Sequence, residues 1–151
     1  MKYRHNIGLG ESIAIQMVDF VRSLHWPIEI MMPVPLGKNR LKERGYNQVG
    51  LVARPLAYRL GLRYEPDSVR KIRETRSQVG LTVSQRRENV QEAYQADPQV
   101  VKRKSILIMD DVATTGSTIS ACTEALLSAG ARDIYVLTIA RALPHHGLDR
   151  V

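Results

Sequence analysis

The stretch ILIMDDVATTGSTI, residues 106–119, joins four apolar residues directly to two adjacent carboxylates, Asp110 and Asp111. A short apolar run of this kind is typical of a buried strand. The apolar residues that follow recur at helical spacing as far as Gly130, which favours a helix end, and Ile134–Ala140 is a second apolar run. Strand, helix and strand in this order predict a βαβ unit, and hence a parallel sheet covered on both faces.

The two carboxylates stand at the predicted carboxyl end of the first strand, which is where open parallel sheets bind their ligands. The loop after them, Thr114-Thr115-Gly116-Ser117-Thr118, enters a helix whose first N–H groups lack internal partners and carry the positive end of the helix dipole. Gly116 would let the backbone approach an anion closely, and the hydroxyls add donors. Since carboxylates accept hydrogen bonds from sugar hydroxyls, the stretch predicts a site for a ribose 5-phosphate.

Three other interpretations of this stretch are weaker. An ordinary strand-to-helix turn is the simplest, but it does not account for the whole string of acids, hydroxyls and glycine. A P-loop nucleoside triphosphatase also has a strand that ends in acids, but the one Gly-Lys pair, Gly37-Lys38, is followed by Asn39, and Met32 occupies the position of the required earlier glycine. The chain contains no GxGxxG string, which argues against a dinucleotide-binding fold.

The charge of the chain is unevenly distributed. The 151 residues carry a formal net charge of +7 with a pI near 9.9. Sixteen Lys or Arg against seven Asp or Glu lie between Lys38 and Lys104. A basic surplus of this size suits a polyanionic partner, either a phosphorylated metabolite or a nucleic acid. The length is that of one domain, and 44% hydrophobic residues suffice for a single core.

The only cysteine, Cys122, excludes an internal disulfide framework and a multi-cysteine zinc site, and it fits a reducing compartment. We expect Cys122 to pack as a small core residue on its helix. No apolar run approaches membrane-spanning length, and the N-terminal residues lack the apolar segment of a signal peptide. These features predict a cytoplasmic protein with no membrane partner.

The rest of the chain alternates between helical and strand patterns. Pro55 falls inside the second helical pattern, where a proline costs about 3 kcal/mol in a regular helix, so we expect a kink or a late start there. Residues 36–48 are a polar stretch without an apolar stripe. The predicted elements are a helix over Glu11–Leu24, a strand over Ile28–Val34, a helix over Val49–Leu60 ended by Gly61, a strand over Ser68–Ile72 and a helix over Val83–Tyr94.

Four stretches together resemble a known family. ILIMDDVATTGST is similar to the phosphoribosyl pyrophosphate (PRPP) signature of type I phosphoribosyltransferases. The strings PVPLGKNRLKERGYNQ, RETRSQVGLTVSQRRENV and AGARDIYVLTIAR, at residues 33–48, 73–90 and 129–141, resemble the ComF family of phosphoribosyltransferase-like proteins, which is associated with competence and DNA uptake in bacteria. The resemblance spans nearly the whole chain. It implies a type I phosphoribosyltransferase fold: a single α/β domain with a central, mostly parallel sheet flanked by helices on both faces.

The resemblance implies a role for each part of the site. Asp110 and Asp111 would be the catalytic pair that contacts the ribose hydroxyls of PRPP, and residues 114–118 would hold its 5-phosphate. Mg²⁺ would be held by substrate oxygens and water, with no direct protein ligand. Positive charge would neutralise the leaving pyrophosphate, and a closed flap would exclude water. The residues implied for the pyrophosphate loop and the flap are Val34, Pro35 and Leu36, and Arg73, Thr75 and Gln78.

Two features depart from the family pattern. Many ComF proteins carry an N-terminal cysteine zinc module, whereas this chain begins almost directly at its first predicted helix. Relatives that salvage purines place an aspartate, a candidate general base, where this sequence has Thr114. A threonine cannot accept a proton at neutral pH, so we do not expect salvage of a 6-oxopurine.

Two functions from different classes remain open. The first is a transferase that displaces pyrophosphate from the anomeric carbon of ribose in favour of an unknown acceptor. The second is a non-catalytic module that handles single-stranded DNA during uptake and keeps the ribose-phosphate cup as a nucleotide or regulatory site. Arg40, Lys42 and Arg44 with Tyr46 could grip phosphates and stack a base, although a charged, solvated loop explains these residues equally well. A homodimer is compatible with the sequence.

Overall fold

The computed structural model describes residues 2–73, 80, 82, 84–85, 93–113 and 116–141, and for residues 2–5, 112–113 and 141 it describes the backbone alone. The predicted site residues Thr75, Gln78, Thr114 and Thr115 lie outside the described residues. The helices are α1 (Lys2–Ser23), α2 (Lys38–Arg44), α3 (Gly50–Leu60), α5 (Pro98–Val101) and α6 (Ser117–Ser128). The strands are β1 (Ile30–Pro33), β2 (Arg63–Tyr64), β3 (Val69–Lys71), β4 (Tyr94–Ala96), β5 (Ser105–Ala113) and β6 (Asp133–Arg141).

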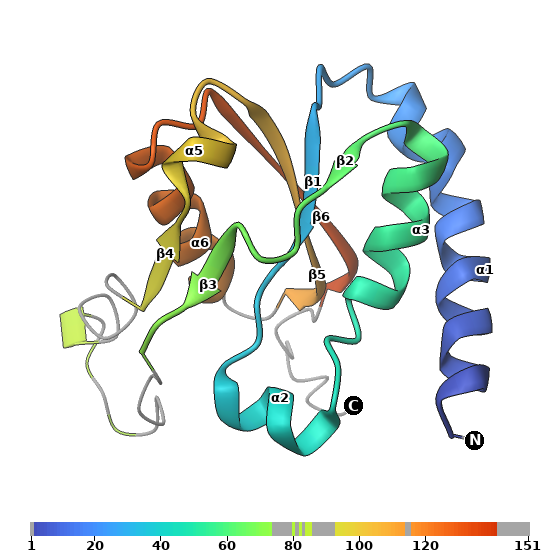
Figure 1. Ribbon diagram of the computed structural model, residues 1–151, viewed down its shortest axis with the longest axis horizontal. Coiled ribbons are helices and arrows are strands. Elements are labelled where there is room, and N and C mark those ends of the chain that lie inside the picture. Colours follow the sequence, from blue (N-terminus) through green and yellow to red (C-terminus); the bar gives the residue numbers. More distant parts are fainter. Residues whose placement is uncertain are drawn as a thin grey trace, which may run out of the picture.

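Four parallel strands form the main sheet in the order β2-β1-β5-β6 (Figure 1). In the central pair, Ile30 lies opposite Ile106 and Pro33 lies opposite Met109. β6 runs beside β5 from the first residue of β5 to its last. A separate antiparallel pair, β3 and β4, packs near α6.

Alternate residues of β1 and β5 face two separate cores, because successive side chains of a strand point to opposite faces. Met31 and Leu107 pack against α1 and α3. Ile30 and Ile106 pack against α6 and the β3–β4 pair. Figure 1 shows α1 and α3 on one side of the main sheet and α6 on the other. The predicted parallel sheet with helices on both faces is confirmed.

Helices α1 and α3 approach each other backbone to backbone at a glycine. α3 runs from Gly50 to Leu60 and continues through Pro55. A proline has no N–H, so the carbonyl of Leu51 receives no helical hydrogen bond from this position. A Cβ built on Gly10 of α1 would lie only 2.6 Å from that carbonyl oxygen. Only glycine therefore allows α1 to lie this close to α3.

A network of polar side chains joins the amino ends of β1, β5 and β6. Glu29 accepts hydrogen bonds from the Lys104 Nζ at 2.9 Å and from the backbone N–H of Ser105 at 3.1 Å. The Ser105 hydroxyl donates to Asp133 at 2.9 Å and accepts a 2.7 Å bond from Arg132. Since the Ser105 side chain is 0% exposed, these bonds satisfy a fully buried hydroxyl.

The structure differs from the predicted helices at two places. α1 begins at Lys2 rather than near Glu11. The sequence did not indicate the first turns because they lie outside the core and carry no apolar stripe; Ile7 and Leu9 are 53% and 62% exposed. Residues 38–44 form α2 rather than a loop. None of the residues of α2 is buried, so no hydrophobic periodicity marks it.

The helix predicted over Val83–Tyr94 and the strand predicted to end before the aspartates also need corrections. Tyr94 opens β4 and does not end a helix; it and Ala96 are buried while the residue between them is exposed, which is the alternation of a strand. The remainder of the helix predicted up to Tyr94 lies mostly outside the described residues. β5 continues past the aspartates to Ala113. Among the described residues, no helix is both long enough and apolar enough to span a membrane.

Candidate functional site

The direction of the strand crossovers reverses between β1 and β5, and this reversal marks one edge of the sheet. From β1 the chain passes through α3 to β2 on one side, and from β5 it passes through α6 to β6 on the other. Such crossovers are right-handed as a rule, so α3 and α6 cover opposite faces. Open α/β sheets bind ligands at the carboxyl ends of the strands beside such a reversal. Residues 34–37, residues 110–113 and Gly116 meet this description.

Asp110 and Asp111 lie within β5, just past the point where β1 ends. β1 pairs with β5 only as far as Met109, whereas β6 continues, with Asp110 opposite Thr138. The pleat of a strand sends successive side chains to opposite faces. Asp110 lies on the α6 side, where it interacts with Cys122, and Asp111 lies on the α3 side. The sequence placed both acids together after a strand; the structure places them within β5, where their side chains leave from opposite faces of the strand while the two carboxyls still interact with each other.

Asp110 is a half-buried carboxyl in surroundings that disfavour its charge. Its Oδ1 accepts a 2.9 Å hydrogen bond from the backbone N–H of Asp111. Burial raises the pKa of Asp110, and the neighbouring Asp111 carboxyl raises it further. In the part of the chain that the structure describes, no ion pair reaches Asp110. A carboxyl of this kind at a strand end is suited to accept hydrogen bonds from a ligand.

Gly116 has the backbone conformation that an anion-binding turn needs. It precedes α6 with φ of 74°, in the left-handed region, and its carbonyl accepts the N–H of Ser120 at 2.9 Å. A Cβ built on Gly116 would meet no described atom within 4 Å, so there is open space beside the turn. Ser117 and Thr118 form the first turn of α6. The start of α6 can therefore admit a phosphate close to its backbone.

The predicted pyrophosphate loop is held in place from two sides. The N–H of Val34 donates to the carbonyl of Met109 at 2.7 Å, which continues the pairing of β1 with β5. The carbonyl of Val34 accepts a 2.9 Å bond from the Asn47 side chain, and Asn47 in turn accepts the N–H of Val49. Pro35 and Leu36 follow, half-buried. Sequence reasoning did not single out Asn47, although the RGYNQ string contains it.

The predicted nucleic-acid contacts lie on and just after α2. Arg40, Lys42 and Arg44 are exposed on this short helix, which Figure 1 shows at the carboxyl end of the main sheet. Arg44 donates to the Gln48 Oε1 at 3.0 Å. Tyr46 follows the helix; it is half-buried and its hydroxyl accepts a 2.8 Å bond from Asn6 of α1. The three cations therefore share one exposed helix, and the ring belongs to the segment that joins this helix to α3.

Tyr94 is a site neighbour that sequence reasoning missed. Burial raises the pKa of its phenol strongly, the Cys122 thiol adds to the effect, and a hydrogen bond with Thr118 partly offsets it. Tyr94 thus links β4 to the first turn of α6. Cys122 itself is fully buried, and burial raises the pKa of its thiol to about 12, so the prediction that it is a core residue is confirmed.

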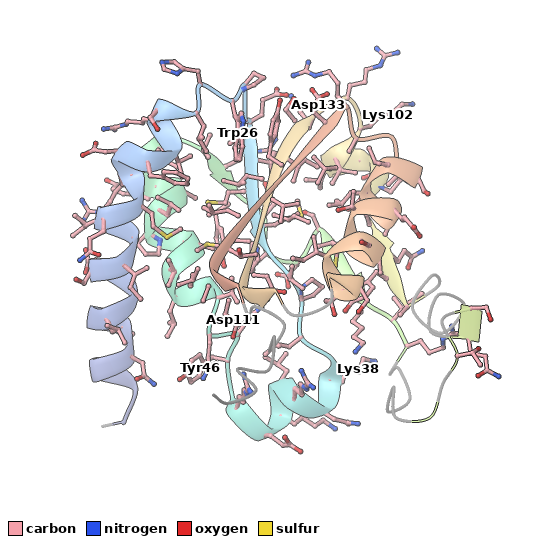
Figure 2. All side chains as sticks on the ribbon, turned by 180° about the vertical axis from the view of Figure 1, so that it is seen from behind. Trp26, Lys38, Tyr46, Lys102, Asp111 and Asp133 are labelled. Atoms are coloured by element: carbon pink, nitrogen blue, oxygen red, sulfur yellow. The ribbon has the colours of Figure 1, made fainter. Side chains whose placement is uncertain are left out.

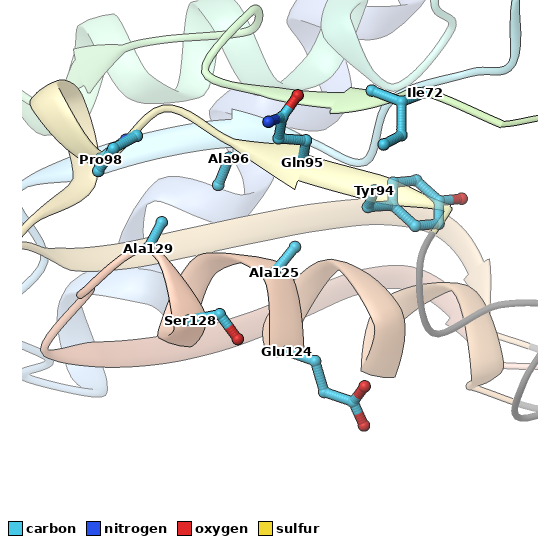
Figure 3. A pocket seen from close by; sticks show the side chains of 9 residues that line it. All are labelled: Ile72, Tyr94, Gln95, Ala96, Pro98, Glu124, Ala125, Ser128 and Ala129. Carbon is cyan, nitrogen blue, oxygen red and sulfur yellow. The ribbon is translucent and has the colours of Figure 1, made fainter.

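A hollow of about 630 Å³ between β4 and α6 is a poor candidate for the site (Figure 3). Its lining is mainly small and apolar, with Ala96, Ala125 and Ala129 at its centre. Among the described residues no cation lines the hollow, and Glu124, the only charged residue of the described lining, points away from it in Figure 3. A phosphorylated ligand would find no partner there.

The donors present are compatible with Mg²⁺. The described residues contain no cluster of three or more His, Cys, Asp or Glu side chains that could hold a metal on their own. Mg²⁺ usually binds one or two carboxylates together with substrate phosphates and water. Asp110 and Asp111 are the carboxylates at the relevant edge of the sheet, and Mg²⁺ binding remains a prediction.

Comparison with known proteins supports the family. A family model described as "Phosphoribosyl transferase domain" matches residues 50–148. The chain is 34% identical over 113 residues to "DNA utilization protein YhgH" of Salmonella typhi and 33% identical over 116 residues to "Competence protein F" of Haemophilus influenzae. These matches cover 75% and 76% of this chain but 49% and 51% of the relatives, so the chain spans about half the length of the curated relatives it matches. The predicted ComF resemblance is confirmed.

Solved structures with the same fold include two phosphoribosyl enzymes. Glutamine PRPP amidotransferase from B. subtilis matches with a TM-score of 0.56 and 18% identity, over 89% of this chain and 26% of that one. Adenine phosphoribosyltransferase from Thermoanaerobacter pseudethanolicus matches with a TM-score of 0.55 and 18% identity, over 87% of this chain and 80% of that one. At identities this low, the structural matches show the fold alone. They confirm the predicted type I phosphoribosyltransferase fold.

Proposed function

Because the chain belongs to the phosphoribosyl transferase domain family, we propose that it binds PRPP with Mg²⁺ and transfers the phosphoribosyl group to an acceptor, releasing pyrophosphate. The observation that supports this best is that Asp110, Gly116 and the loop at Val34 belong to one edge of the sheet, at the reversal between β1 and β5. A carboxyl, an anion-binding turn and a second loop match the three parts of PRPP: the ribose, the 5-phosphate and the pyrophosphate.

The 5-phosphate would bind at the start of α6. There the turn at Gly116 lets the backbone come close, and the first N–H groups of the helix point at the anion. The ribose hydroxyls would donate to Asp110. Hydrogen bonds to the ionised carboxyl favour its charged form, so they would offset the burial that raises the pKa of Asp110.

The pyrophosphate would lie against residues 34–36, close to exposed cations. Lys38 and Arg40 of α2 and Arg73 after β3 are candidates to neutralise its charge. When bound with the substrate, Mg²⁺ supplies further neutralisation of that charge. In the transfer, the bond between the anomeric carbon and the pyrophosphate oxygen breaks, pyrophosphate leaves with the electron pair, and the acceptor nucleophile forms a new bond to the carbon.

Two glycines of the same geometry allow a matched test of the phosphate turn. Gly116 and Gly61 both have positive φ, 74° and 69°, and both have open space where a Cβ would go. Valine at either position imposes the same backbone strain, but only Gly116→Val would obstruct a phosphate. We expect calorimetric titration with PRPP and Mg²⁺ to show that Gly116→Val binds at least tenfold more weakly than Gly61→Val.

The result would count against the proposal in two ways. No binding of PRPP to the parent protein would remove the proposed function altogether. Equal binding by the two valine variants, with matching circular dichroism, would show that the phosphate does not lie at the start of α6.

A second function, the handling of single-stranded DNA, is supported by one observation. α2 presents four cations and one acid, and none of its residues is buried, so the helix is available to a polyanion. If the three cations Arg40, Lys42 and Arg44 contact DNA phosphates, their replacement by alanine should flatten the salt dependence of binding by about one to three units of log slope. DNA binding would need no Mg²⁺.

A control for the DNA experiment removes the same charge elsewhere. Arg54, Arg59 and Arg63 are exposed on α3 and β2, away from α2. Their triple replacement by alanine should leave the salt slope closer to that of the parent than the α2 variant does. Equal slopes for the two triple variants would attribute binding to net charge and would exclude a site on α2.

A further inference from the structure

The outer edge of β6 has no partner strand within the part of the chain that the structure describes. β6 is the last strand of the main sheet and pairs with β5 on one side only. The opposite edge of the sheet is β2, which has only two residues. Natural proteins protect sheet edges by shortening the edge strand, or by placing charges, prolines or bulges along it. β6 has nine residues, so it lacks the protection that short length gives β2.

The sequence of β6 does not protect this edge either. Its interior, residues 134–140, contains no charged residue, glycine or proline. Val136 and Ile139 are apolar and β-branched, yet both are 39% exposed. In Figure 2, β6 runs from Asp133 toward Asp111 with α1 on one side and α6 on the other, and neither helix lies in front of it. A strand of this composition and exposure is suited to pair with another strand.

The backbone of β6 presents a defined set of polar groups at the open edge. The N–H of Arg132, just before β6, donates to the carbonyl of Lys104 at 2.9 Å, so the backbone groups of Arg132 point toward β5. The direction of these groups alternates along a strand. Tyr135, Leu137 and Ile139 therefore direct their N–H and C=O groups outward, where a further strand would bond to them.

The sequence of β6 is complementary to itself in the antiparallel direction. Consider two copies that pair with Leu137 opposite Leu137. Asp133 of each copy then lies opposite Arg141 of the second copy. Tyr135 of each copy lies opposite Ile139 of the second copy. Opposite charges and aromatic–β-branched pairs are favourable cross-strand neighbours. Sliding one copy by two residues in either direction removes both opposite-charge pairs, so the sequence favours a single register.

The side chains at the amino end of β6 are held in place before any second strand arrives. Asp133 accepts hydrogen bonds from the Ser105 hydroxyl at 2.9 Å and from Arg132 at 3.2 Å, and its side chain remains 47% exposed. The ring of Tyr135 stacks on Trp26 with centroids 4.8 Å apart. Little side-chain order would therefore be lost in the pairing, which lowers the cost of association.

We propose that the outer edge of β6 binds a second copy of this chain, with the two β6 strands antiparallel about a two-fold axis at Leu137 and the two main sheets joined into one. Such a contact is isologous, so each favourable pair occurs twice. The amino end of one main sheet would lie beside the carboxyl end of the other. The two candidate PRPP sites would then face opposite ends of the joined sheet, and the inference does not depend on the proposed transferase function.

Amide hydrogen exchange followed by NMR distinguishes the outward groups from the inward ones. We expect the N–H groups of Tyr135, Leu137 and Ile139 to exchange about tenfold more slowly in a concentrated sample than in a dilute one, because hydrogen bonds between the two copies protect them. The N–H groups of Val136 and Thr138 point toward β5, so their exchange should change far less. Sedimentation equilibrium on the same samples gives the dissociation constant of the dimer.

Ile139 and Ile15 provide a matched pair of variants. Ile139 is 39% exposed at the edge of β6, and Ile15 is 51% exposed on α1. Ile139→Lys places a charge opposite Tyr135 of the second copy and should weaken self-association about tenfold or more. Ile15→Lys adds the same charge elsewhere and should leave the dissociation constant within about twofold of the parent value. The circular dichroism of both variants should match that of the parent.

Charge reversal tests the register. Arg141→Asp places two acids opposite each other, and Asp133→Arg places two arginines opposite each other, so each variant alone should self-associate about tenfold more weakly than the parent. An equimolar mixture of the two variants restores both opposite-charge pairs. The mixture should therefore form a mixed dimer with an affinity close to that of the parent.

The inference would be overturned at several points. A parent chain that stays monomeric up to its solubility limit would exclude the dimer. Equal self-association of Ile139→Lys and Ile15→Lys, or equal protection of outward and inward N–H groups, would assign the dimer to another surface. A mixture of the two charge-reversed variants that associates no better than either alone would exclude the antiparallel register at Leu137.

Discussion

Carboxylates at the two ends of the main sheet, Glu29 and Asp110, have opposite surroundings: among the described residues, the first is paired with cations and the second is not. At the amino end, Glu29 is paired with Lys104 and Arg132, and the hydrogen bond from Lys104 is the largest cause of the lowered pKa of Glu29. At the carboxyl end, burial raises the pKa of Asp110, and no ion pair within the described residues compensates it. Figure 2 shows Asp133 at the one end and Asp111 at the other.

This difference in pairing distinguishes carboxylates that stabilise the fold from a carboxylate that is available to bind a ligand. The acids at the amino end meet their partners inside the protein, and the stacked rings of Trp26 and Tyr135, with centroids 4.8 Å apart, close the same end. The charge of Asp110 is unfavourable in its half-buried position, and hydrogen-bond donors of a bound ligand would stabilise it. Sites of function are commonly less stable than the rest of a fold for this reason.

The largest effect should come from the carboxyl end. Asp110→Asn keeps the shape of the side chain but removes its charge, and a hydrogen bond to a charged group contributes about 1.5–3 kcal/mol. We therefore expect PRPP affinity to fall by about tenfold to a hundredfold in calorimetric titrations with Mg²⁺. Asp133→Asn makes the same chemical change at the amino end and should leave PRPP affinity as it is. Similar losses in both variants would contradict the proposed division.

A smaller effect, on stability alone, is expected at the amino end. Ser105→Ala removes a fully buried hydroxyl that bonds to Asp133 and Arg132, and it leaves those charged partners without it. Losing one partner of a buried hydrogen bond costs about 1–3 kcal/mol, which urea unfolding would measure as a lower free energy of unfolding. PRPP affinity measured on the folded variant should not change. A Ser105→Ala variant as stable as the parent would mean that the polar network at the amino end does not contribute to the free energy of unfolding.

The smallest effects concern the pH dependence of stability. We expect Glu29 and Asp110 to affect it with opposite signs. The folded-state pKa of Glu29 is lowered, so its contribution to stability is present above its unfolded pKa of about 4.3 and is lost as the pH falls through the folded value. The folded-state pKa of Asp110 is raised, so its favourable contribution is fully present below its unfolded pKa of about 3.9 and is lost as the pH rises through the folded value.

Thermal unfolding of two variants would measure these signs. At pH 7, Glu29→Gln should lower the melting temperature, whereas Asp110→Asn should raise it because it removes a poorly solvated charge. Both differences from the parent should shrink as the pH falls below the unfolded pKa values of the two carboxyls, about 3.9 for Asp110 and 4.3 for Glu29. Shifts of the same sign at pH 7 would show that the two ends do not differ in the way described.

The unit from β5 to β6 was predictable because each part of it has a clear hydrophobic period. The strand expected over Ile134–Ala140 is β6, Asp133–Arg141, and the helical stripe that ends at Gly130 belongs to α6. α2 was not predictable as a helix, since it buries no residue and so carries no apolar stripe. β2 consists of two residues that form a strand only through pairing with β1. Such pairing leaves no local signal in the sequence.

The candidate site was predictable in composition but not in geometry. Hydrophobicity stops at Met109, so the sequence ends the strand there, whereas pairing with β6 carries β5 on through Asp110 and Asp111. That continuation makes the two side chains leave β5 from opposite faces, and no motif in the sequence indicates this. Asn47 and Tyr94 were missed because each acts alone, Asn47 through its bonds to backbone groups and Tyr94 through its burial, and single residues produce no pattern.

The pairing of β1 with β5 also governs when a ligand site can come into existence as the protein folds. The N–H of Ser105 donates to Glu29, 76 residues earlier in the chain, so the central strand pair closes a long loop. Contacts this distant in sequence form slowly, since the entropy of loop closure opposes them before packing rewards them. On the ribosome, β1 must wait for β5 to be synthesised before either loop of the site has a neighbour. A ligand that bridges the two loops would therefore bind only the completed fold. It would stabilise the pairing of β1 with β5 against unfolding.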